Sequence, residues 1–469
     1  MPLRPYTIRT FRGGISDENN KGIAGSFKFG YGLDIRGRPD VLTCGQALVK
    51  ESGTVVTDLV RFIIPCSNGK AYGFGDAGCI YERSGTTWVK RYTDADGAIK
   101  GAAEWNGYLY WACNTQISRI QISAIPAATW TTEVAHDWQT TLTAADWHTM
   151  LIACGALMIC NDKYLALVDY SGVFNATALN LYPGNIAKCL DEDGFYVIAG
   201  LVDAGNAEKG YLLTWQTSAL NWIKKKKIAS KGVNALITTE LMLAQCGIDG
   251  EVYFSDMVSR VPIFSFPDKG FALPGGVCDR KGLAMFGISG NSSAKCGIYS
   301  YGRNKKNSPL LLNLDYVGSP GKITTIEYGA IEVVNGTLLV AWKDGSTYGV
   351  DALSTTVKSN GVYEGLEWDG GWPMMKKTFG KVKIVMEPLA ASCSIVFKYK
   401  INGASSWSTA KTTDGASSFS TENGVRALFN IDEEGEVIEL RVELTSNSNN
   451  SPKIKSINTY FDFPKMAMW

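Results

Sequence analysis

Only two histidines occur in the chain, His136 and His148, in the segments AHDWQ and ADWHTM. Asp146 with His148 has the residue types of an orienting pair, and a serine nucleophile would complete a triad, but no GxSxG motif is present. The dipeptides Asp137-Trp138 and Asp146-Trp147 repeat around the two histidines. This repetition favours a structural Asp–His–Trp turn that ties one unit of the chain to the next. We therefore expect no catalytic residues.

Carboxylates gather at residues 191–193 and 432–434, and each group is followed by glycine and flanked by apolar, strand-like sequence. This pattern predicts solvated turns, because a calcium loop needs alternating oxygen ligands over a longer span. The eleven cysteines are spread from Cys44 to Cys393 without a CxxC pair. Zinc ligands cluster at short spacing, so we expect reduced structural thiols, no metal and no cofactor.

Four consecutive lysines, Lys224 to Lys227, form the only basic run. They have two interpretations: contact with nucleic acid, such as DNA that passes through a channel, or protection of an edge strand against pairing with other chains. No ladder of aromatic residues accompanies the run, which favours the edge interpretation. The chain as a whole has 46 basic and 45 acidic residues, a net charge of +1, and this excludes nucleic-acid binding through the field of the whole protein.

Two short segments that contain glycine partly match known sequence motifs. GFGDAG, from Gly73 to Gly78, matches the dinucleotide fingerprint, but the sequence continues as a strand where that fingerprint needs a helix, so it predicts a hairpin. SGTTW resembles the tail of the Asp-box of sialidase-type propellers, although Tyr81 and Arg83 stand at that motif's Ser and Asp positions. The complete box is itself a structural turn. A glycan-cleaving enzyme would need two facing carboxylates, which the sequence does not locate.

The elements that must position these residues are hairpins. Between about residues 60 and 355, an apolar strand, a turn of Gly, Asp or Asn, and a second strand recur. Equivalent strands begin at Tyr72, Tyr108, Leu157, Tyr196, Leu241, Leu283 and Leu338, in steps of 36 to 55 residues. Such a repeat predicts an all-β fold with a β-propeller over residues 61–365, because blades around an axis cover one another's faces. About seven irregular blades fit the repeat, although six or eight irregular blades would fit it equally well. Stacked β-sandwiches are the alternative fold.

The two ends differ from the repeat. From about Phe379 the strands lengthen, and Ile438, Leu440, Val442 and Leu444 alternate with polar residues, which predicts a C-terminal β-sandwich over residues 379–469. Residues 366–378 are expected to be a linker or docking strap. Residues 1–60 predict an extended arm that completes the last blade or reaches a neighbour. The longest apolar run, residues 150–160, is too short to span a membrane and predicts a buried strand pair.

Three segments carry a resemblance to a known family: FRGGISDENNKGIAGSFKFGYGLDIR, GAIKGAAEWNGYLYWACNTQISRI and EVIELRVELTSNSNNSPKIKSINTYFDF. Together they resemble bacteriophage tail structural proteins that carry a propeller, as in tail nozzles, tail tips and fibre-proximal parts. The resemblance implies a non-enzymatic virion protein that assembles in the host cytoplasm as a homo-oligomer and contacts other tail proteins. Thirteen Trp and twenty-one Tyr are consistent with large interfaces.

Two other functions remain open at this stage. A receptor-recognition protein would bind host glycan through exposed Trp and Tyr, either on the sandwich or on the propeller loops. A propeller-class enzyme would cleave glycan. A WD40-type scaffold is less favoured, because the repeats lack the GH and WD signatures at their usual offsets.

Overall fold

The computed structural model describes residues 4–16, 24–51, 56–126, 130, 132–229, 231–290, 295–303 and 305–463. The described chain is all-β, with a single short 3₁₀ helix at Ile122–Ala124. Within the described part of the chain, no helix is long and apolar enough to cross a membrane.

The chain divides into two compact units. Unit 1 contains Met1–Leu48, Tyr299–Val317 and Leu353–Trp469, and unit 2 contains Val49–Ile298 and Gly318–Ala352. The chain therefore passes from one unit to the other four times. The points of division differ from the expected boundaries at residues 60, 365 and 378, because residues 4–8 pair with residues 457–461 and residues 27–31 pair with residues 362–365.

Unit 2 is built from antiparallel sheets of consecutive strands. The first two sheets are β5 (Val60–Pro65), β6 (Ala71–Gly75), β7 (Cys79–Ser84) and β8 (Thr87–Thr93), then β9 (Gly101–Trp105), β10 (Tyr108–Ala112), β11 (Ile117–Gln121) and β12 (Val134–Gln139). The third is β13 (Met150–Ala153), β14 (Ala156–Asn161), β15 (Tyr164–Val168) and β16 (Phe174–Asn180). The fourth and fifth are β17 (Asn185–Asp193), β18 (Tyr196–Asp203), β19 (Asn206–Trp215) and β20 (Lys224–Ala229), then β21 (Val233–Thr238), β22 (Met242–Cys246), β23 (Glu251–Ser255) and β24 (Arg260–Ser265).

The remaining strands of the repeat complete this series. β25 (Val277–Arg280) pairs with β26 (Leu283–Ile288), and β27 (Gly297–Arg303) runs across the division at residue 298. The last sheet has the order β29 (Glu327–Val334), β30 (Thr337–Asp344), β31 (Thr347–Lys358) and β4 (Gln46–Lys50). Its outer strand therefore comes from the N-terminal segment.

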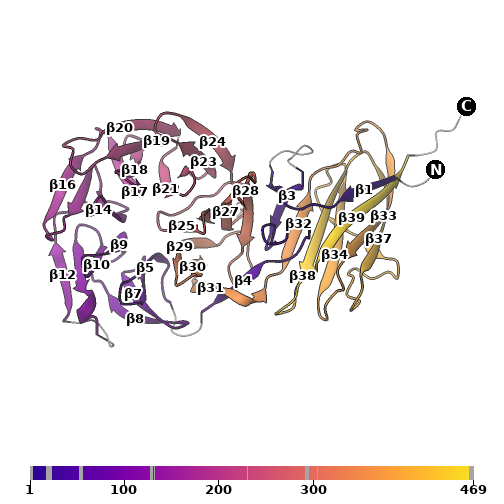
Figure 1. The fold of residues 1–469 in the computed structure, drawn as a ribbon, viewed down its shortest axis with the longest axis horizontal. Coiled ribbons are helices and arrows are strands. Elements are labelled where there is room, and N and C mark those ends of the chain that lie inside the picture. The colour runs from indigo at the N-terminus through magenta and orange to yellow at the C-terminus, as the bar shows by residue number, and fades with distance from the viewer. Residues whose placement is uncertain are drawn as a thin grey trace, which may run out of the picture. The chain divides into compact units, whose positions relative to one another are not determined.

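The first strands of these sheets form a closed ring. β5, β9, β13, β17, β21, β25 and β29 contact one another in this order, and β29 contacts β5. Figure 1 shows β5, β9, β17, β21, β25 and β29 toward the centre of unit 2, with β12, β16, β20 and β24 at its rim. The first and last sheets also share a hydrophobic core that includes Val60, Tyr81, Ala330 and Leu339. Unit 2 is a β-propeller.

Glycines allow the inner strands to approach closely. A Cβ atom on Gly329 of β29 would lie 2.1 Å from the carbonyl oxygen of Val60 in β5. At Gly101 of β9 it would lie 1.8 Å from the carbonyl oxygen of His148. Both distances are far below van der Waals contact, so the ring closes at these positions only because no side chain is present.

The hairpin predictions are confirmed. GFGDAG joins β6 to β7 without a helix, and residues 150–160 form the strand pair β13 and β14. Of this pair, β14 is buried as predicted, whereas Ile152 of β13 is exposed. In the turns that start at Asn106 and Asn335, the Asn and the following Gly both have positive φ, with Asn at 47° and 49°. That conformation matches the twist of the flanking strands, which is why Asn-Gly suits tight hairpins.

Unit 1 contains two sheets. One has the order β1 (Arg4–Ile8), β39 (Ile454–Asp462), β33 (Lys377–Met386), β37 (Arg426–Gly435) and β36 (Lys411–Thr412). The other contains β28 (Leu310–Tyr316), β3 (Ser26–Tyr31), β32 (Gly361–Gly365), β38 (Ile438–Thr445), β34 (Ser394–Ile401) and β35 (Ser408–Thr409), with β2 (Gly14–Ile15) beside β3. Alternate residues of both sheets, such as Phe379, Phe429, Phe397 and Leu440, form one hydrophobic core.

The segment before β33, which was expected to be a linker or docking strap (residues 366–378), packs against this core. Trp368 forms a β-bridge with Ile438, and its ring stacks on Tyr6 at 4.3 Å between ring centroids. Buried Lys377 donates hydrogen bonds from Nζ to the carbonyl oxygens of Trp372, Met375 and Glu436. The segment is therefore held at both ends.

Candidate functional site

His148 is a structural residue. Its ring is buried, with Nδ1 2.8 Å from the carbonyl oxygen of Cys160 and Nε2 2.8 Å from that of Asn114. Burial lowers the pKa of His148, and its two hydrogen bonds to carbonyl groups act in the opposite direction. Asp146 lies on the surface, so the orienting pair considered from the sequence is not formed.

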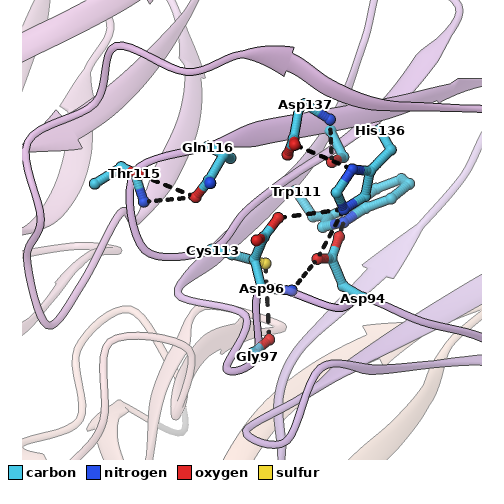
Figure 2. A network of polar contacts seen from close by, with 10 residues as sticks. Asp94, Asp96, Gly97, Trp111, Cys113, Thr115, Gln116, His136 and Asp137 are labelled. Atoms are coloured by element: carbon cyan, nitrogen blue, oxygen red, sulfur yellow. Dashed lines mark hydrogen bonds and ion pairs between the residues drawn. The ribbon is translucent and has the colours of Figure 1, made fainter.

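His136 has a different environment, because three carboxylates surround it (Figure 2). Its Nε2 lies 3.5 Å from Asp94 Oδ1 and 3.2 Å from Asp96 Oδ2, and its Nδ1 lies 3.2 Å from Asp137 Oδ2. Asp94 and Asp96 belong to the connection from β8 to β9, whereas His136 and Asp137 lie on the outer strand β12. We call these four residues the Asp–His cluster.

An irregularity in β12 brings His136 and Asp137 to the same side. Consecutive residues of a regular strand point to opposite faces. Here the register with β11 shifts between Ile117 and Arg119, and Asp137 has a φ of 53°. Its backbone N–H donates to Ser118 Oγ at 3.1 Å. A bulge of this kind re-aims side chains, so neighbouring residues can both face the cluster.

Asp94 is the fixed member of the Asp–His cluster. Its side chain is fully buried, Oδ2 accepts a hydrogen bond from Trp111 Nε1 at 2.6 Å, and Oδ1 accepts one from the backbone N–H of Asp96 at 2.9 Å. The Trp111 ring is itself buried in the core between the first two sheets. These bonds hold the carboxylate in a single orientation.

Negative charge is concentrated at this place. Burial raises the pKa of Asp96, and the Asp137 and Asp94 carboxylates raise it further, while His136 lowers it. Burial, with the nearby Asp94 charge, also raises the pKa of Tyr92 to about 12. A group of three carboxylates and one imidazole can hold a metal cation or a proton.

The centre of the ring encloses a second set of carboxylates. A cavity of about 320 Å³ is lined by residues of all the first strands, among them Asp191, Asp279 and Glu332. Burial raises the pKa of Glu332 to about 7 and also raises that of Asp191. The prediction of a turn at residues 191–193 is wrong, because all three residues lie in β17; Asp191 is partly buried, whereas Glu192 and Asp193 are exposed. Residues 432–434 are exposed but also lie within a strand, β37.

The lysine run lies on β20, the outermost strand of its sheet and not one of the strands that line the central cavity. Lys225 Nζ lies 3.3 Å from the ring centroid of Tyr182 and 4.0 Å from that of Tyr211. These aromatic partners are not adjacent to the lysines in sequence: Tyr211 lies on the neighbouring strand β19, and Tyr182 precedes β17. Partial burial lowers the pKa of Lys225.

A larger cavity of about 610 Å³ lies elsewhere in unit 2. Its lining includes Asp146, Trp147, Asp162, Lys188 and Lys231. Lys188 Nζ donates to Asn234 Oδ1 at 2.6 Å, and burial lowers the pKa of this ammonium group. An indole beside charged and amide groups suits a polar organic ligand.

No protein-family model and no curated protein matches the chain. Among solved structures, the chain is similar to the WD40 β-propeller domain of Doa1, with 14% identity, a TM-score of 0.47, and coverage of 66% of this chain and 98% of that domain. It is also similar to the β-propeller domain of Cps50 (Swd1) from Myceliophteria thermophila, with 12% identity, a TM-score of 0.46, and coverage of 66% and 100%. Similarity at this level assigns the chain to no family.

Proposed function

We propose that this chain is a non-enzymatic structural protein of a bacteriophage tail, which assembles in the host cytoplasm and attaches neighbouring copies and other tail proteins. Its body would be a seven-bladed propeller and its C-terminal part a β-sandwich. The closed cycle of first strands supports the blade number. The core shared by the two sheets of unit 1 supports the sandwich.

The observation that carries this proposal is an apolar surface on the turns of unit 2. Tyr170, Phe195 and Leu220 are 74%, 77% and 94% exposed. They occupy the turns that follow β15, β17 and β19. Strands alternate in direction, so turns after the first and third strands of each sheet lie at the same end. Large apolar groups that are exposed at the same end of neighbouring sheets are typical of an interaction surface, as attachment to neighbours requires.

The solution mass of the protein tests this proposal. Light scattering over a range of concentrations is expected to show a closed oligomer, and the double variant Tyr170→Ser/Phe195→Ser is expected to shift the mass toward the monomer. Glu192→Gln, an exposed change beside the same turn, is the control and is expected to leave the mass unchanged. A protein that stays monomeric and binds no tail protein would contradict the proposal, as would turnover of a polysaccharide.

A second candidate is glycan binding at the 610 Å³ cavity, because Trp147 lies there among carboxylate, ammonium and amide groups. A glycan array is expected to give a signal that falls at least tenfold in Asp146→Ala. Asp193→Ala, which changes an exposed carboxylate outside the cavity, is the control. An equal signal from both variants, or no signal from the unmodified protein, would exclude this site.

A further inference from the structure

We propose that Asp94, Asp96 and His136 bind one divalent cation of the zinc class, with Asp137 as the residue that orients the imidazole. The ligand atoms would be Asp94 Oδ1, Asp96 Oδ2 and His136 Nε2. This site does not depend on the proposed function, because it concerns one connection and one outer strand within unit 2.

The spacing of the three atoms suits a common ion. All of them lie within 4.8 Å of one another. The two distances from His136 Nε2 to the carboxylate oxygens are 3.2 and 3.5 Å. Bonds of about 2.0–2.2 Å from zinc to nitrogen and oxygen give a tetrahedron with edges of about 3.3–3.6 Å. Three protein ligands leave a fourth position for water.

The imidazole is oriented as in known metal sites. A metal-binding histidine usually donates its other ring N–H to a carboxylate or carbonyl group, which fixes the tautomer. Asp137 Oδ2 lies 3.2 Å from Nδ1, so an N–H at Nδ1 points at this carboxylate. The lone pair at Nε2 then faces two further carboxylates. A metal cation between these three groups would offset their mutual repulsion.

The surroundings of the two ligand carboxylates, Asp94 and Asp96, also favour metal binding. Asp94 is held by Trp111 and by the backbone of Asp96, the kind of support that ligating carboxylates receive from surrounding groups. Asp96 Oδ2 is buried and lies 3.2 Å from His136 Nε2, and the Asp137 carboxylate acts on it as well. A cation at this oxygen would offset the repulsion between the two carboxylates.

The mixture of donors indicates the kind of metal. Imidazole nitrogen suits zinc and its neighbours among the transition metals, whereas calcium and magnesium prefer sites made of oxygen alone. When bound, the ion would tie β12 to the connection between the first two sheets. Because β12 lies at the edge of its sheet and pairs only with β11, the ion would give this strand a second attachment.

Calorimetric titration of the full chain, stripped of metal with a chelator, tests the site. All proteins would carry Cys154→Ser, because Cys154 is the one exposed thiol and could bind zinc by itself. Zinc is expected to bind with a stoichiometry of one and to raise the melting temperature, and calcium is expected to bind at least tenfold more weakly. Cobalt is expected to bind at the same place and give the visible absorption of a tetrahedral site.

The variants separate the roles of the four residues. His136→Ala and Asp96→Asn are each expected to abolish saturable zinc binding and the cobalt spectrum. Asp137→Asn is expected to weaken binding about tenfold, since it leaves all three ligands in place. The control Asp193→Asn is expected to bind like the parent. Melting curves recorded without metal show whether each variant is folded. Absence of saturable binding by the parent, or unchanged binding by folded His136→Ala, would overturn the proposal.

Discussion

His136 and His148 show how neighbouring atoms decide what an imidazole can do. The nitrogens of His148 face backbone carbonyl groups inside the core, whereas those of His136 face side-chain carboxylates at a partly exposed position. The first ring is fixed by the backbone and has no open side. The second has carboxylate oxygens near both of its nitrogens, which is the arrangement on which the proposed metal site rests.

Glu332 gives a prediction on pH at the scale of the residue. Its pKa is about 7 in the folded protein, above its ordinary value of 4.5, because burial disfavours the charged form. The folded state is therefore most stable with Glu332 protonated, and it loses stability as the pH rises from about 4.5 to about 7. At pH 8 this loss is at most about 3 kcal/mol.

Glu332→Gln keeps the neutral form at every pH. We expect thermal denaturation to show a higher melting temperature than the parent at pH 8 and nearly the same one at pH 4. Glu434→Gln, at an exposed carboxylate, should differ little from the parent at either pH. A Glu332→Gln variant no more stable than the parent at pH 8 would show that Glu332 ionises without cost.

The sequence could not predict the Asp–His cluster, because its members become neighbours only through folding. Asp94 and Asp96 precede β9, and His136 follows them by some forty residues on the outer strand of the same sheet. The segment TDADG that contains both aspartates was the available signal. It resembles an ordinary turn until the bulge in β12 is known.

Among the elements, β20 shows how an outer strand is protected. Its lysines lie where unpaired backbone groups face solvent, and Lys224 and Lys227 are the exposed ones. A strand edge invites pairing with another chain, and lysine opposes this because pairing would bury its charge. The interpretation of the run as an edge strand agrees with this position.

Lys224→Val/Lys227→Val is expected to aggregate, because the change replaces the two exposed charges of the edge strand with apolar, β-branched side chains. Light scattering during incubation at elevated temperature should show earlier growth of large particles than for the parent. Lys224→Arg/Lys227→Arg keeps both charges and serves as the matched control. Equal aggregation of the valine and arginine variants would mean that the charges do not protect the edge.

Hairpins were predictable from the sequence because their signals are local. The Asn-Gly pairs and the alternation of residues 438–444 need no knowledge of distant parts. The pairing of β1 with β39 was beyond such reasoning. It joins segments separated by hundreds of residues, and no short pattern in either strand specifies its partner.

On the scale of the molecule, closure of the ring depends on the contact between β29 and β5. Gly329→Ala would place a Cβ atom 2.1 Å from the carbonyl oxygen of Val60 and so push these strands apart. We expect a loss of about 2 kcal/mol or more, measured by denaturant unfolding. Gly380→Ala, where nothing lies within 4 Å of the added atom, is the control. Equal stability of both variants would show that the ring adjusts at no cost.

The position of β4 has a consequence for synthesis on the ribosome. β4 and β5 are made early, but β31, which pairs with β4, and β29, which contacts β5, are made about three hundred residues later. At about 5–20 residues per second, the early strands wait roughly 15–60 s with unpaired edges. During that interval they are exposed to other nascent chains. The hydrogen bonds between β4 and β31 therefore form last, although β4 is among the first strands to be synthesised. The yield of folded protein then depends on whether β4 and β5 avoid pairing with other chains before synthesis is complete.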